Sequence, residues 1–253
     1  MSDQVPQVLY ASPDPGSTGR FRTRYLQVLW AVFAVIWAIA CVRPESQVNW
    51  WTENALTLIF VVILFSTRRR FPLSIVSHTL IVVYLTLHTV GAHYSYSKVP
   101  YNEWWQAIFG RPLHGGRNHY DRLIHFLFGL LLAYPIREVF LRVAGVRGFW
   151  GYYLPLDVTM SFSMVYELIE WGYAVVAGGD AGQSFLGTQG DEWDAHKDMA
   201  LASLGALISM SVVAFINWRF DKSFGDEFRK SLGVRDGDKP LGEVRLAELR
   251  RGK

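Results

Sequence analysis

Six long apolar segments run through this chain, and they constrain its fold more than any other feature. A helix needs about 20 mostly apolar residues to cross a bilayer, and 51% of the 253 residues are hydrophobic. The segments therefore predict an all-α polytopic membrane protein built as a bundle of six transmembrane helices. The second segment carries Glu53 and Asn54 near its start. The predicted spans cover residues 25–42, 51–66, 74–90, 120–140, 152–176 and 199–218.

The two ends of the chain differ from this apolar middle. Residues 1–22 are polar and rich in Pro, Gly and Ser, and we expect them to form a disordered cytoplasmic tail. Residues 23–220 then form the membrane domain, and residues 221–253 form a charged cytoplasmic tail. The formal net charge is only +3, so nucleic-acid binding is not expected.

Lys and Arg concentrate in alternate connections between the predicted spans. Cytoplasmic loops of membrane proteins are enriched in these residues. The pattern predicts six crossings with both termini in the cytoplasm, and it places the connections 93–119 and 177–197 outside. The basic clusters are Arg20, Arg22 and Arg24; Arg68, Arg69 and Arg70; Arg137, Arg142 and Arg147; and Arg219 with Lys222.

Acids and histidines gather near the external ends of several spans. Asp121 and His125 are four residues apart and share one helix face. A carboxylate and an imidazole so placed can bind a metal together or form an acid–base pair. The structural alternative is an Asp that stabilises the helix N-terminus and a His bonded to a neighbouring helix. Ionisable groups are costly within a bilayer, so a functional site is the working hypothesis.

The next two spans add further carboxylates. Glu167 and Glu170 share a face of the fifth span, and Glu167 lies about one turn deeper. Two close carboxylates at low dielectric need a cation or a shared proton, unless Glu170 reaches the interface and Glu167 bonds across the bundle. Asp198 begins the sixth span, whereas Asp191 and Asp194 precede it and are expected to cap it. The small-residue stripe Ala202, Gly205 and Ser209 predicts close helix packing.

The external connection 93–119 contributes weaker candidates. His88 and His93 are five residues apart, so they do not share a helix face, and with Glu170 they are secondary candidates. A short interfacial helix is expected near residues 101–109. Positive residues are unusual on the external side, and an anionic lipid head group is one expected partner for them, with solvated arginines as the alternative. These residues are Arg111, Arg117 and Arg122.

Four segments of the chain resemble the YjdF-like bacterial inner-membrane proteins. They are HTVGAHYSY at 88–96, NHYDRLIHF at 118–126, YELIEW at 166–171 and GTQGDEWDAHKDM at 187–199. The resemblance covers most of the last four spans. It implies a multi-pass protein of the bacterial inner membrane whose biochemical function is not established.

A more distant resemblance is to VanZ-like membrane proteins, which are known for glycopeptide-antibiotic resistance. The segment DRLIHF at 121–126 is similar to their Asp–Lys–x–x–His–Phe helix start, with Arg in place of Lys. Glu167 falls in the place of their acid-bearing segment, and Asp198 precedes a small-residue helix as theirs does. This resemblance implies Asp121, His125, Glu167 and Asp198 as site residues.

Both lines of reasoning predict a polar pocket at the external face, where Asp121, His125, Glu167 and Asp198 converge from three helices. These residues would act in catalysis and could also hold a divalent metal. The favoured function is an enzyme acting on a lipid or lipid-linked envelope substrate, because Asp, His and Glu are mixed. The alternatives are a cation- or proton-coupled transport or binding protein, and a structural envelope scaffold without catalysis.

Overall fold

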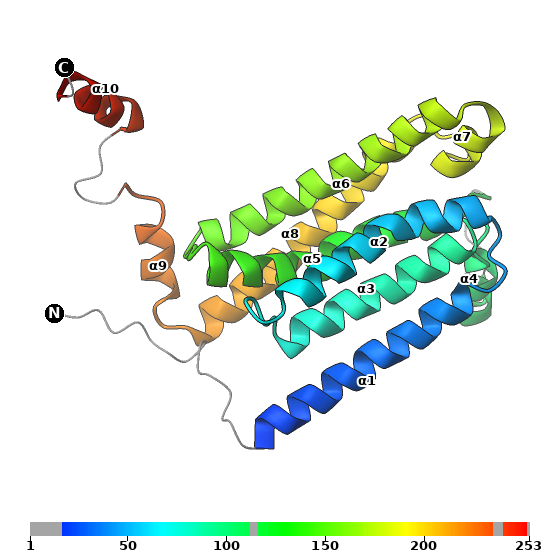
Figure 1. The fold of residues 1–253 in the computed structure, drawn as a ribbon, viewed down its shortest axis with the longest axis horizontal. Helices are drawn as coiled ribbons and strands as arrows, with labels where there is room; N and C mark the ends of the chain where they lie inside the picture. The colour runs from blue at the N-terminus through cyan, green and yellow to red at the C-terminus, as the bar shows by residue number, and fades with distance from the viewer. Residues whose placement is uncertain (1–16, 112–115, 235–239, 252–253) are drawn as a thin grey trace.

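The computed structural model describes residues 17–111, 116–234 and 240–251, and every regular element within these ranges is a helix. Six long helices run side by side in alternating directions (Figure 1). They are α1 (Ser17–Ala40), α2 (Gln47–Thr67), α3 (Ile75–His93), α5 (Tyr120–Val143), α6 (Trp150–Ala177) and α8 (Asp194–Phe220). The shorter helices are α4 (Tyr101–Phe109), α7 (Gly179–Leu186), α9 (Phe224–Lys230) and α10 (Leu241–Arg251).

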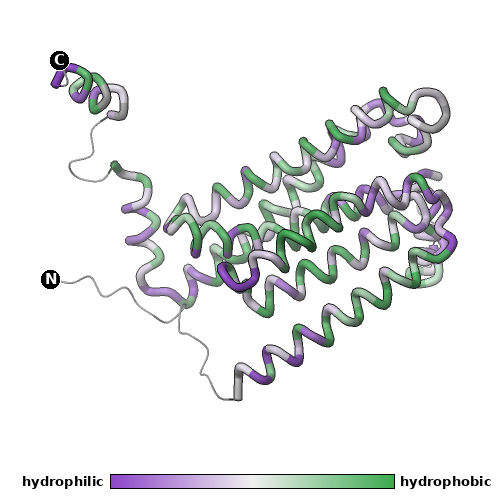
Figure 2. Tube along the Cα trace, viewed as in Figure 1, coloured by the Kyte–Doolittle hydropathy of each residue, from purple (hydrophilic) through white to green (hydrophobic). Residues whose placement is uncertain are grey.

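The apolar character of these helices confirms an all-α polytopic membrane protein. Five of them (α1, α2, α3, α5 and α8) are long and apolar enough to cross a membrane, and Figure 2 shows their hydrophobic middles. In α6, Glu167 and Glu170 lower the hydropathy, although its 28 residues reach about 42 Å and exceed the ~30 Å hydrocarbon core. α6 packs against α5 and α8 and therefore belongs to the bundle. That α6 crosses the membrane stays a prediction.

The helices follow the predicted spans, and most extend a few residues further. α1 begins at Ser17, inside the segment expected to be a disordered tail; the rest of that segment lies outside the described residues. Contacts with α3 and the turn before it hold this first part of α1 in place. Arg22 donates to the Leu73 carbonyl at 2.8 Å, and the Tyr25 and Thr79 hydroxyls are 2.8 Å apart. The short interfacial helix expected near residues 101–109 is confirmed as α4.

α5 and α8 cross at very short distance and share the largest helix–helix interface. A Cβ atom at Gly129 would lie 1.9 Å from the Ala202 carbonyl oxygen, and one at Gly205 would lie 2.1 Å from that of Phe126. Glycine at both positions is therefore what lets the two backbones touch. The stripe predicted for close packing is confirmed, and Ser209 continues it as a buried residue.

A partly buried carboxylate on α5 joins two helices at one end of the bundle. We call the end at which α5 and α8 begin the site end, and the end at which α3 and α6 begin the opposite end. At the opposite end, Glu138 of α5 accepts hydrogen bonds from the Ser74 backbone N–H at 2.9 Å and the Ser77 hydroxyl at 2.5 Å. Glu138 also pairs with Arg142 at 2.6 Å. These bonds fix the start of α3 against the end of α5.

Candidate metal centre at one end of the bundle

Asp121, His125 and Asp198 come together at the site end, in the first two turns of α5 and α8. One ligand atom from each of the three residues lies within 4.8 Å of the other two. On α5 the spacing of four residues places Asp121 Oδ1 3.7 Å from His125 Nε2. Asp198 approaches from α8, whose distance from α5 is set by the glycine crossing about two turns further along.

Glu167 reaches the same place from α6. Its Oε1 lies 3.4 Å from His125 Nε2. Glu167 Oε1 and Asp198 Oδ1 are both buried and have no hydrogen-bond partner among the described residues, and Asp198 is only 2% exposed. A buried carboxylate oxygen without a partner is costly. The geometry therefore calls for a cation or a bound proton between these side chains.

The donor set of this cluster suits a particular class of ion. It offers one imidazole nitrogen and the oxygens of Asp121, Glu167 and Asp198. Magnesium and calcium prefer all-oxygen ligands, whereas zinc and the ions around it in the first transition row accept imidazole together with carboxylate. A divalent cation would also offset part of the negative charge that the three carboxylates would otherwise hold in a buried position.

A second polar group adjoins the first, and sequence reasoning missed two of its members, Glu53 and Tyr166. Glu53, on α2, is 6% exposed and accepts a hydrogen bond of 2.5 Å from the Tyr166 hydroxyl. The Tyr166 ring packs edge-on against His125, with centroids 5.9 Å apart, and so joins the two groups. His88 Nδ1 lies 2.5 Å from the Tyr96 hydroxyl. The available clue was a carboxylate, Glu53, inside an apolar run.

The secondary candidates separate in space. His88 lies in the second polar group, and its Nε2 is buried without a partner among the described residues. His93 is held elsewhere, with Nδ1 2.7 Å from the Ala40 carbonyl oxygen, and it joins the end of α3 to the end of α1. Glu170 lies one turn beyond Glu167 and within electrostatic range of Asp121. The structure thus places His88 and Glu170 near the cluster and His93 away from it.

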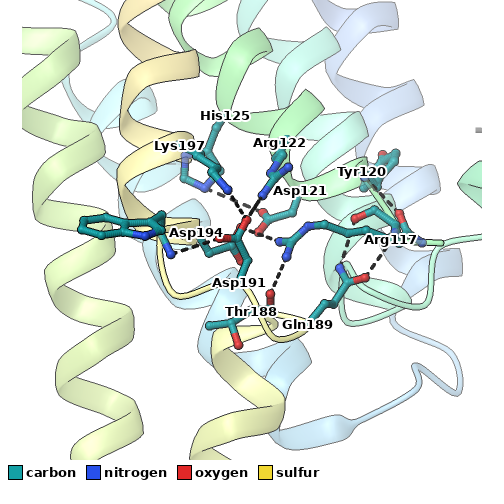
Figure 3. Close-up of polar contacts among 12 residues, drawn as sticks. Arg117, Tyr120, Asp121, Arg122, His125, Thr188, Gln189, Asp191, Asp194 and Lys197 are labelled. Carbon is teal, nitrogen blue, oxygen red and sulfur yellow. Dashed lines mark hydrogen bonds and ion pairs between the residues drawn. The ribbon is translucent and has the colours of Figure 1, made fainter. Parts of the chain in front are cut away.

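An ion-pair network covers the site end, and we call it the latch (Figure 3). Arg117 pairs with Asp194 and donates to the Thr188 carbonyl oxygen, while Arg122 pairs with Asp191 and lies 3.3 Å from Asp194. The latch also includes Lys197, whose Nζ is 2.6 Å from Asp191. The hydrogen bond from Lys197 lowers the pKa of Asp191 to about 2, so this carboxylate stays ionised at neutral pH. The latch ties the connection before α8 to the start of α5.

The contacts of the latch bear on two predictions made from the sequence, helix capping by Asp194 and lipid binding by the arginines. Asp194 does lie in the first turn of α8, as expected for a capping residue, but its carboxylate is engaged by arginines. Arg117 and Arg122 had been expected beside an anionic lipid head group; both are paired with carboxylates, and Arg111 is exposed. The lipid head-group contact of these arginines stays a prediction.

A cavity of about 650 Å³ extends from the cluster into the bundle between α2, α3, α5 and α6. At the site end its wall is polar and includes Glu53, His88, Tyr96, Asp121, His125 and Tyr166. Towards the opposite end its wall is almost wholly apolar, with residues such as Leu64, Phe128 and Leu132. The cluster is thus the polar end of an otherwise apolar cavity.

Fold and site together define a class: a polytopic helical membrane protein with a buried histidine–carboxylate cluster that opens onto an apolar cavity. The chain belongs to the family described as predicted membrane protein (DUF2238), whose model matches residues 25–219. The inner membrane protein YjdF of Escherichia coli (strain K12) is 38% identical over 185 residues, which are 73% of this chain and 86% of that protein. No solved structure shows a significant match. The YjdF-like resemblance is confirmed, and the chain is a multi-pass inner-membrane protein.

Proposed function

We propose that this protein is a metal-dependent membrane enzyme that acts on the polar head of a lipid or lipid-linked envelope substrate. One observation carries the proposal: Asp121, His125 and Asp198 offer ligand atoms within 4.8 Å of one another, beside the apolar cavity. The unpartnered oxygen of Asp198, a residue 98% buried, supports a cation rather than a purely structural role.

Each residue of the cluster has a role in this proposal. Asp121, His125 and Asp198 would hold the metal, and Glu167 would be a fourth ligand or a general base. The chemistry supplied by such a metal would be to polarise a phosphoryl or carbonyl oxygen of the substrate and to make water more acidic. Tyr166 packs against His125 and donates a hydrogen bond to Glu53, so these two residues line the cavity beside the ligands and would position the head group.

The orientation of the site follows from the charge distribution. The basic clusters between α2 and α3, between α5 and α6 and after α8 all lie at the opposite end. The positive-inside rule then assigns that end to the cytoplasm and the site end to the periplasmic face. Arg117, Arg122 and Lys197 lie at the site end, but the Lys and Arg residues of the clusters at the opposite end outnumber them.

The first test is the metal content of the protein purified in mild detergent. We expect the wild-type protein to bind a divalent transition metal, measured by elemental analysis and by competition with a chelator. Asp198→Asn and His125→Ala should each weaken binding at least roughly 100-fold, because changes in the outer shell of a metal site alone cost about 10–100-fold.

Two matched variants act as controls for this test. His93→Ala removes a histidine bonded to the Ala40 carbonyl oxygen, and Asp157→Asn removes an exposed carboxylate of α6 near the opposite end. Both should keep the metal. The proposal fails if the cluster variants bind metal as tightly as these controls. It also fails if the protein instead drives uptake that collapses with the proton gradient and needs no metal.

A further inference from the structure

We propose that the cavity is a lateral groove that holds one long hydrocarbon chain of the lipid substrate, entered sideways from the bilayer between α2 and α6. This inference rests on the proposed function, because it takes the cluster as the place of the polar head. It adds the chain class of the substrate and its route of entry.

The length of the groove is the first argument. Glu53 and Thr67 both line it, and they lie 14 residues apart on α2 (67 − 53), which is about 21 Å of helix. Half of the hydrocarbon core of a bilayer is only about 15 Å. The groove therefore continues past the bilayer midplane. A hydrocarbon chain that fills the groove must be longer than half the thickness of the hydrocarbon core.

The chemistry along the groove is the second argument. Polar groups occur at the site end, where Asp121, His125 and Glu53 line the wall. Further along, Ile81, Leu85 and Phe128 leave little for a polar ligand to bind. A ligand that satisfies both ends has one polar group and one long apolar chain, which is the build of a membrane lipid.

The opening of the groove is the third argument. Exposed apolar residues form both of its rims, and they include Ile63 of α2 and Phe162 of α6, each 56% exposed. Ile63 lies on α2, which is long and apolar enough to cross a membrane, and α6 is predicted to cross beside it. The groove is then continuous with the surface that faces lipid. α2 packs mainly against α3, and α6 packs against α5, α7 and α8, so the two rims belong to separately supported helices. The Tyr166–Glu53 hydrogen bond bridges them next to the cluster.

The test measures which lipids remain bound to purified protein in a mild detergent, by native mass spectrometry. The probes are a short-chain phosphatidylglycerol, a long-chain phosphatidylglycerol and a polyprenyl phosphate. Wild-type protein should bind the short-chain probe at least roughly tenfold more weakly than a long-chain one, because each additional methylene buried in the groove adds to the affinity. Retention of the long-chain phosphatidylglycerol identifies an acyl chain as occupant, and retention of the polyprenyl phosphate alone identifies an isoprenoid chain.

Variants that fill the groove locate the chain within it. Ile63→Trp and Val139→Trp change exposed residues of the groove wall, so neither variant threatens the core. Both should reduce retention of long-chain lipid and leave the short-chain probe unaffected, since each lies far from the cluster. Val62→Trp is the matched control, because Val62 adjoins Ile63 on α2, is 63% exposed and lies outside the groove.

The outcomes separate this inference from the proposed function. Equal binding of short and long chains, or equal retention by Ile63→Trp, Val139→Trp and Val62→Trp, would overturn the groove. The metal content of the same samples reports on the cluster independently. Metal retained with lipid discrimination absent contradicts the groove alone, whereas selective lipid retention without metal contradicts the metal centre alone.

Discussion

Replacing Gly205 by alanine is expected to lower the free energy of unfolding by about 3 kcal/mol, near the upper end for overpacking. The new Cβ would lie 2.1 Å from the Phe126 carbonyl oxygen, so α8 would have to move away from α5. Neither backbone can give way without disturbing its own hydrogen bonds. Thermal unfolding in detergent should show a melting temperature lower by roughly 10 °C.

The same variant should disturb the cluster as well as the fold. Asp198 lies on α8, and Asp121 and His125 lie on α5, so separating these helices pulls the ligand atoms apart. Metal affinity should therefore fall even in the fraction of protein that stays folded. Gly172→Ala on α6 is the control, since its Cβ would meet no atom within 4 Å. That change should stabilise its helix by about 0.5–1 kcal/mol, and equal melting of the two variants would refute the close crossing.

The second large effect concerns the latch. Arg117→Ala should destabilise the protein by about 3 kcal/mol, because it leaves the buried carboxylate of Asp194 with one partner fewer. The two side chains are only 12% and 6% exposed, and Arg122 lies 3.3 Å from the same carboxylate. The connection between α7 and α8 should also loosen, which limited proteolysis would detect as new cleavage there.

An exposed ion pair gives the control for this prediction. Arg229 and Asp226 are 82% and 72% exposed, so Arg229→Ala should change stability by less than about 1 kcal/mol. Replacing Arg117 and Asp194 together by Met and Leu should recover much of the stability lost in Arg117→Ala, since Arg122 keeps Asp191 as its partner and no buried charge is then left unpaired. If Arg117→Ala and Arg229→Ala unfold alike, the latch does not hold the site end.

The sequence predicted the helices well because an apolar run of about membrane length has few alternatives to forming a transmembrane helix. It also predicted Asp121 with His125, since a spacing of four residues determines a shared helix face. Glu53 was missed as a site residue because a carboxylate near the start of a predicted span looks like the edge of that span. Only the packing of α2 opposite α6 turns it towards Tyr166.

Pairings between distant residues were beyond prediction. Arg117 and Asp194 are 77 positions apart. Asp194 was expected to cap the sixth span, and Arg117 was expected to contact a lipid head group or solvent. Gly129 was not singled out, because an isolated glycine in a helix gains meaning only when its partner across the interface is known. The backbone contact with Ala202 supplies that meaning.

The cluster draws its side chains from three helices, and α8 is the last of them in the chain. During synthesis, α5 and α6 emerge from the ribosome before Asp198 does. The nascent chain therefore passes through a stage in which Asp121, His125 and Glu167 are present without Asp198 and without the latch. Completion of the cluster therefore coincides with insertion of α8. The proposed metal site would accordingly form only when the bundle itself is closed.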